Sequence, residues 1–185
     1  VVASSTLGSR VLGLARDALT VAFLGLGAVS SSFVFAFTVP NLFRRLLGEG
    51  ALSSAFIPIF AESIEQEGRE AAFRFANVVL SWLAAVTGVL VGLGAVLFAG
   101  LGWMLENSAW GADFARSNPE LYAQWDLGFV LGAALMPYLS MVCLAAIFGA
   151  ILNVLHRFAV PALTPVLLNL AMIGGLLLGG KWLGL

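Results

Sequence analysis

Charged side chains are scarce in this sequence. Only 10% of the 185 residues are Asp, Glu, Lys or Arg, whereas 61% are hydrophobic. A soluble domain has about 25% charged residues and fewer than half apolar ones, so a water-soluble core cannot accommodate the excess of apolar side chains. The mean hydropathy of +1.01 describes the whole chain. The composition excludes a soluble globular domain and indicates that lipid is the solvent for most of the chain.

Cysteine and histidine are nearly absent as well. The chain has one cysteine, Cys143, and one histidine, His156, which exclude an internal disulfide and a metal site of clustered Cys and His. No glycine-rich phosphate loop precedes a helix. The nine Lys and Arg residues are scattered along a chain of net charge -1, which argues against a nucleic-acid-binding surface. We therefore expect no enzyme, no cofactor and no nucleic-acid partner.

The sequence does contain long uncharged runs. Residues 75–105, 127–155 and 158–180 have no Asp, Glu, Lys or Arg. A helix needs about 20 apolar residues to cross about 30 Å of hydrocarbon, and the runs lack the apolar–polar alternation of barrel strands. We predict an all-α, polytopic transmembrane helix bundle, with the charged segments 62–74 and 106–126 as solvated loops.

Two interpretations are open for the first part of the chain. Residues 18–43 are uncharged and can form one transmembrane helix. Alternatively, a turn within residues 25–32, where glycines permit positive φ and serines can cap a new helix, divides the region in two. The two helices then cover residues 1–26 and 31–62, and the second is broken near residues 48–50.

The second interpretation makes the charges of this region candidates for function. It puts Arg16, Asp17 and Arg44 near the bilayer midplane, where each charge costs about 2.5–3.5 kcal/mol. Such a cost is tolerated where the charges face water or each other. A guanidinium donates two parallel hydrogen bonds to a phosphate, so the two arginines indicate an anionic ligand in a polar chamber.

Three further charged residues have alternative roles. Arg10 is seven residues from Asp17 and shares its helix face two turns away, and it can also reach the cytoplasmic interface. Arg45 points about 100° away from Arg44, so one of the two serves structure or lipid headgroups. Glu49 lies between two glycines and is either an ion-pair partner of an arginine or a solvated carboxylate.

The basic residues near the span ends predict an orientation. Arg69, Arg74 and Arg157 fall on one side of the membrane, against Arg116 and Lys181 on the other. Lys and Arg are enriched in cytoplasmic loops. We expect the N-terminus of the chain in the cytoplasm.

Three segments carry recognisable motifs. Residues 9–17 read SRVLGLARD, residues 39–62 read VPNLFRRLLGEGALSSAFIPIFAE, and residues 149–169 read GAILNVLHRFAVPALTPVLLN. These blocks resemble those of the MurJ (MviN) lipid II flippases in order and separation, and the resemblance covers essentially the whole chain. The chain starts at Val1 rather than Met, so we expect a piece of a longer protein.

The resemblance implies a fold. It predicts the N-terminal lobe of a fourteen-helix transporter of the MATE-like superfamily. This chain would hold about five complete helices and the start of a sixth in a single transmembrane domain, residues 1–185. The expected helices cover 1–26, 31–62 with a break, 74–105, 127–155 and 158–180.

The resemblance also implies residue roles. The cavity arginines of the family fall on Arg16 and Arg44, with Asp17 beside the former, and these would hold the diphosphate of lipid II. Arg10, Arg45 and Glu49 also match positions of the family, and these lie near the cytoplasmic gate or the substrate portal. Many members carry an acidic residue early in the second helix, whereas this sequence has Ser31, so the role of that carboxylate does not carry over.

The implied function is transport. A lipid II flippase moves an undecaprenyl-diphosphate-linked peptidoglycan precursor from the cytoplasmic to the outer leaflet of the bacterial inner membrane by alternating access. Its partners would be lipid II, membrane lipids and a coupling ion. The alternatives are an exporter of another lipid-linked oligosaccharide or of drugs in the same superfamily, and a non-transporting scaffold for cell-wall enzymes.

Overall fold

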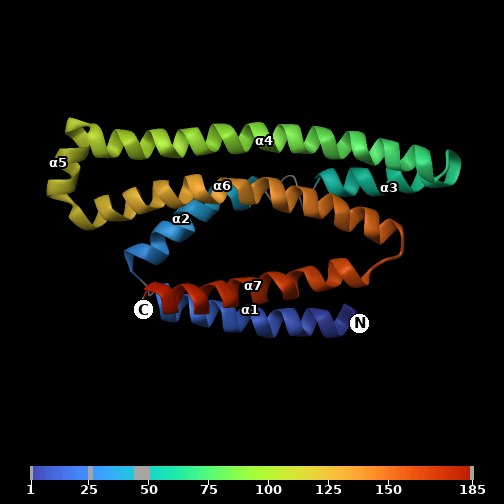
Figure 1. The fold of residues 1–185 in the computed structure, drawn as a ribbon, viewed down its shortest axis with the longest axis horizontal. Helices are drawn as coiled ribbons and strands as arrows, with labels where there is room; N and C mark the ends of the chain where they lie inside the picture. Colours follow the sequence, from blue (N-terminus) through green and yellow to red (C-terminus); the bar gives the residue numbers. More distant parts are fainter. Residues whose placement is uncertain (1, 25–26, 44–50, 184–185) are drawn as a thin grey trace.

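The chain forms two groups of helices in a computed structural model that describes residues 2–24, 27–43 and 51–183. In these residues the elements are α1 (Val2–Leu24), α2 (Ala28–Phe43), α3 (Ala51–Gln66), α4 (Arg69–Asn107), α5 (Ala109–Ser117), α6 (Pro119–Val154) and α7 (Ala159–Leu183). Figure 1 shows α4 beside α6, with α2 and α3 packed against α6, and α1 beside α7 as a separate pair. The prediction of an all-α helix bundle is confirmed.

The helical conformation is interrupted at Gly27, between α1 and α2. Helix α1 ends at Leu24 and α2 begins at Ala28, so residues 18–43 do not form one continuous helix. The first turn of α2 is closed by Ser31, whose backbone N–H and hydroxyl both donate to the carbonyl of Gly27, at 3.2 and 3.3 Å. The predicted break near residues 48–50 lies outside the described residues.

The segment 62–74, predicted as a solvated loop, is largely helical. Helix α3 continues to Gln66 and α4 begins at Arg69. The reversal between them uses Gly68, whose φ of 87° lies in the left-handed region that glycine adopts without strain. The prediction is wrong because charged residues mark where a helix leaves the hydrocarbon, and not where it ends.

The segment 106–126 is helical as well, contrary to the prediction of a loop. Ser108 caps the short helix α5 by accepting a hydrogen bond from the N–H of Gly111 at 2.9 Å. Pro119 then occupies the first turn of α6, where its missing N–H costs nothing. The chain therefore turns between α4 and α6 through a helix with defined caps.

Three described helices are long and apolar enough to cross a membrane: α4, α6 and α7 over Ala159–Leu178. They contain the three uncharged runs predicted from the sequence. Helix α4 has 39 residues and a length of about 58 Å at 1.5 Å per residue, so it extends beyond the hydrocarbon layer of about 30 Å. Lys181 and Trp182, expected to follow the last span, belong to α7.

The hydrophobic core lies between α4 and α6. Close packing is possible because glycines face large side chains there: Gly132 faces the ring of Phe98, Gly94 faces Met136, and Gly128 faces Phe35. The Phe35 ring of α2 meets the rings of Phe98 and Phe129 edge to face. The buried core residues also include Phe56, Phe60, Leu83, Leu105, Leu139, Cys143 and Ile147.

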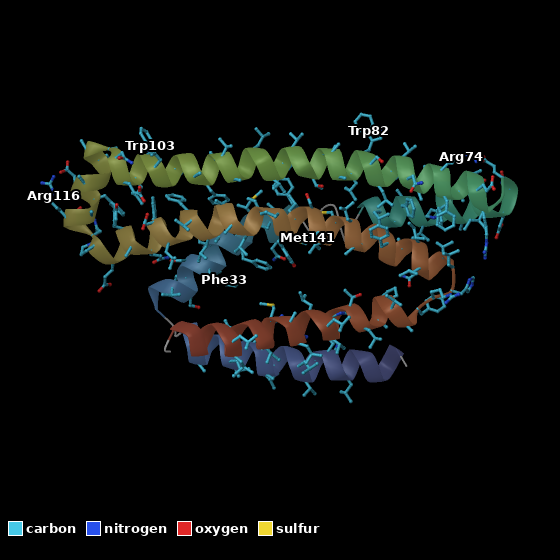
Figure 2. The ribbon with its side chains drawn as sticks, viewed as in Figure 1. Phe33, Arg74, Trp82, Trp103, Arg116 and Met141 are labelled. Atoms are coloured by element: carbon cyan, nitrogen blue, oxygen red, sulfur yellow. The ribbon has the colours of Figure 1, made fainter. Side chains whose placement is uncertain are left out.

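The pair of α1 and α7 is packed differently from this core. In the best apolar window of each span, 33% of the residues are buried in α6 but only 6% in α7. The exposed apolar faces suit contact with lipid or with other parts of a larger protein. Figure 2 shows Trp82 projecting from the side of α4 that faces away from α6, and both Trp82 and Trp103 are exposed.

Gly132→Ala is expected to destabilise the protein. A Cβ at this position would lie 2.7 Å from two carbons of the buried Phe98 ring, so the ring or helix must shift at a cost of about 1–3 kcal/mol. The measurement is the thermal unfolding temperature of the full-length protein in detergent. Gly149→Ala on the same helix is the control, because nothing lies within 4 Å of its Cβ. Equal unfolding temperatures for the two variants would contradict the packing.

Candidate functional site

Arg16 lies where α1 packs against α7. Its Nη1 donates a hydrogen bond to Oδ1 of Asn169 at 3.1 Å, across the interface between the two helices. Its Nε and Nη2 donate to Oδ1 of Asp17 at 3.0 and 2.7 Å, forming an ion pair within α1. The Arg16 side chain is 28% exposed, so the guanidinium is held by its neighbours while part of it reaches the surface.

Asn169 completes this group, although the sequence patterns did not predict it. It is 5% exposed, and its Nδ2 donates to the carbonyl oxygen of Ser9 at 3.0 Å. Both ends of the amide are therefore satisfied by α1. The sequence feature that could have indicated Asn169 is an amide side chain within the uncharged run 158–180. A polar side chain in a membrane helix commonly forms a hydrogen bond with another helix.

The residues of α1 that meet Asn169 share one helix face. Ser9, Gly13 and Arg16 are spaced by four and three residues, which aligns them on one side of a helix. A Cβ on Gly13 would lie 3.7 Å from Nδ2 of Asn169, so the amide rests directly on this face. Arg16 lies 14 residues after Val2 and eight before Leu24, well inside the helix.

The arrangement is suited to an anion that carries more than one oxygen. A guanidinium has five N–H donors, and the hydrogen bonds to Asp17 and Asn169 use one each on Nε, Nη1 and Nη2. In the described part of the chain this leaves the second N–H groups of Nη1 and Nη2 for a ligand. Phosphate oxygens accept charge-assisted hydrogen bonds from such guanidinium N–H groups.

The other predicted site residues fall into two classes. Arg10 is exposed on α1, and Asp17 forms its ion pair with Arg16, so the structure brings Arg16 and Asp17 together and leaves Arg10 apart from them. Arg44, Arg45 and Glu49 lie outside the described residues, in the segment 44–50 between α2 and α3. Their proposed roles stay predictions.

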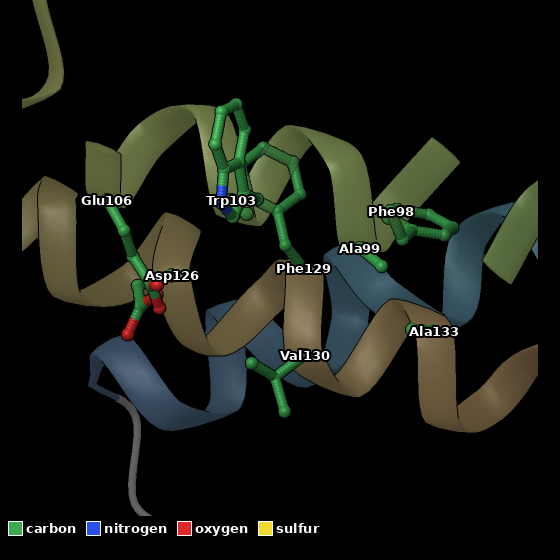
Figure 3. A pocket seen from close by; sticks show the side chains of 9 residues that line it. Phe98, Ala99, Trp103, Glu106, Asp126, Phe129, Val130 and Ala133 are labelled. Carbon is green, nitrogen blue, oxygen red and sulfur yellow. The ribbon is translucent and has the colours of Figure 1, made fainter. Parts of the chain in front are cut away.

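A hollow lies between α4 and α6, close to α5. Its volume is about 320 Å³, and Figure 3 shows Glu106 and Asp126 at one end of it, with Trp103 and Phe129 among its apolar lining. One carboxylate oxygen of Asp126 is buried without a hydrogen-bond partner among the described residues. Two carboxylates repel a phosphorylated ligand, so this hollow is unsuited to an anion.

Comparison with known proteins identifies the family. The family model described as "Lipid II flippase MurJ" matches residues 20–184. The "Probable lipid II flippase MurJ" of Rhizobium tropici is 40% identical over 179 residues, covering 95% of this chain and 31% of that protein. The "Lipid II flippase MurJ" of Burkholderia cenocepacia is 37% identical over 175 residues, covering 93% and 32%.

The chain thus spans about a third of the length of these curated relatives. The "Probable lipid II flippase MurJ" of Bdellovibrio bacteriovorus gives the same proportion, with 36% identity over 181 residues that cover 97% of this chain and 33% of that protein. The long apolar helices agree with a part of a multi-pass membrane protein. The chain belongs to the lipid II flippase MurJ family.

Proposed function

We propose that the full-length protein is a lipid II flippase, and that this chain supplies part of the site that holds the diphosphate. The relatives named above are called lipid II flippases, and lipid II carries a diphosphate between its lipid tail and its headgroup. The observation that carries the proposal is the guanidinium of Arg16, which Asp17 of α1 and Asn169 of α7 hold in place and which keeps N–H donors without a partner among the described residues.

The energetic cost of Arg16 supports a functional role. A charge at the centre of a membrane helix costs about 2.5–3.5 kcal/mol, and the ion pair with Asp17 at 2.7 Å offsets part of that cost. Intramembrane charges of this kind face a wet cavity or each other. Arg16 does both in this proposal, because its exposed part faces the water-filled cavity of the complete transporter.

Asp17 compensates the charge of Arg16 when no cargo is bound. Its carboxylate accepts from Nε and Nη2 of Arg16 through Oδ1. A diphosphate entering the site competes with this carboxylate for the same guanidinium, which permits release as well as binding. Arg44 supplies the second guanidinium of the clamp, while Arg10, Arg45 and Glu49 serve the cytoplasmic gate or the substrate portal.

Transport proceeds by alternating access. The cavity opens to the cytoplasm, the arginines bind the diphosphate while the lipid tail stays in the bilayer, and rocking of the two lobes releases the headgroup on the outer side. The coupling ion or the membrane potential supplies the driving force, since moving one elementary charge across 100 mV corresponds to about 2.3 kcal/mol. No covalent step is required.

The distribution of basic residues supports an orientation with the N-terminus in the cytoplasm of a bacterial inner membrane. Figure 1 shows the N-terminus, the turn between α3 and α4 and the link between α6 and α7 at one end of the molecule. Arg74 lies at this end and Arg116 at the opposite one (Figure 2). The sequence adds Arg69 and Arg157 to the first end, and Lys and Arg are enriched on the cytoplasmic side.

Arg16→Ala and Arg44→Ala in the full-length protein are expected to abolish rescue of a bacterium depleted of its own lipid II flippase. Each variant removes a cation that binds the diphosphate, while the fold is retained. The measurement is colony formation at matched membrane expression. The control is Arg116→Ala, which removes an exposed ion pair with Asp113 worth about 0–1 kcal/mol, and it should rescue fully. Equal rescue by all three variants would favour a non-transporting scaffold.

Cysteine labelling tests the wet cavity. Asp17→Cys in the full-length protein should react with a small charged thiol reagent added from water, because Asp17 has a side chain 66% exposed in a water-filled chamber. Ala36→Cys is the control, since Ala36 is fully buried, and the buried native Cys143 should also stay unreactive. Complete protection at position 17 would place the site in protein or lipid and contradict the proposal.

A further inference from the structure

Asn169 is a buried polar side chain on α7, the helix that packs against α1. Its two hydrogen bonds go to α1, one from Arg16 Nη1 at 3.1 Å and one to the carbonyl of Ser9 at 3.0 Å. Its 5% exposure leaves little room for direct contact with a large cargo. Any effect of Asn169 on transport therefore acts through the residues that it touches.

The amide has one orientation that satisfies both neighbours. The carbonyl of Ser9 can only accept a hydrogen bond and the guanidinium of Arg16 can only donate. Nδ2 must therefore face Ser9, and Oδ1 must face Arg16. A flipped amide would set two acceptors together at Ser9 and two donors together at Arg16. The bond to Ser9 thus fixes the acceptor that Arg16 meets.

The same contact restricts the guanidinium. Asp17 is the neighbouring residue on α1 and can follow Arg16 through several rotamers, whereas Asn169 belongs to another helix and defines a point in space. Because Asp17 and Asn169 both hold the guanidinium of Arg16, its remaining N–H groups are kept in a single orientation. The ordering of a long side chain is then complete before a ligand arrives, which lowers the entropic cost of binding.

We propose that Asn169 is a positioning residue that holds the guanidinium of Arg16 ready for a phosphate oxygen of the cargo. The inference rests on the proposed function, because it assigns Arg16 to the diphosphate. The competing explanation is that Asn169 only joins α1 to α7, as polar side chains do between membrane helices. The two explanations differ in whether the effect of Asn169 requires Arg16.

The first test needs no substrate. The full-length protein in detergent is treated with phenylglyoxal, an arginine-specific reagent, and modification is measured peptide by peptide by mass spectrometry. Asn169→Leu should raise the modification of Arg16 several-fold relative to Arg10, which is exposed on the same helix and serves as the internal reference. Asn169→Asp should keep it low, because a carboxylate still accepts from Arg16. The matched control is Asn77→Leu at an exposed site on α4.

The second test measures lipid II affinity in a double-mutant cycle. Asn169→Leu should weaken binding about tenfold, the size expected for losing a hydrogen bond to a charged group, and should have no further effect in the Arg16→Ala background. Equal losses in both backgrounds would overturn the positioning role, as would an unchanged ratio of Arg16 to Arg10 modification. Asn169→Ala is made alongside, so that a folding defect of the leucine variant leaves the test intact.

The failure of the proposed function has a different signature. If Arg16→Ala alone binds lipid II as tightly as the unmodified protein, Arg16 is not a diphosphate ligand and the proposed site is wrong. If Arg16→Ala weakens binding and Asn169→Leu does not, the site stands and only the role of Asn169 is refuted.

Discussion

A guanidinium held between two helices needs hydrogen-bond and charge partners, and Arg16 finds them where α1 packs against α7. The guanidinium of Arg16 carries a positive charge and five N–H donors. The chain provides one carboxylate from the next residue and one amide from a helix that is 153 positions away in sequence. The first partner offsets the charge, and the second ties its location to α7.

The two groups of helices are packed in different ways. Helices α2, α3, α4 and α6 share a core of aromatic and aliphatic side chains, in which glycines admit the rings of Phe35 and Phe98. The pair of α1 and α7 has few buried side chains and is joined by a polar contact. The first group holds the hydrophobic core, whereas the second carries the charge that the proposed function uses.

The sequence predicted the parts of the fold that depend on composition. The uncharged runs 75–105, 127–155 and 158–180 each lie within one helix, because apolar length alone decides whether a helix can cross the bilayer. It also singled out Arg16 and Asp17, since charges in an apolar helix are costly. The loops at 62–74 and 106–126 were predicted wrongly, because charge shows where lipid ends and carries no information on where backbone hydrogen bonding ends.

Asn169 could not be predicted with the same reasoning. An amide within an apolar run shows that a partner exists but not which helix supplies it, and that depends on how α7 returns beside α1. The pairing joins residues that are 153 and 160 positions apart. Arg44, Arg45 and Glu49 lie outside the described residues, so their predicted roles rest on the resemblance and on the chemistry of their side chains.

The contact between Asn169 and α1 also sets the helical phase of α7. One inserted or deleted residue between Ala159 and Asn169 would turn the amide by about 100° around the helix axis and move it by about 1.5 Å along it. Its Oδ1 would then face away from α1. This stretch can therefore vary in side chains during evolution far more readily than it can vary in length.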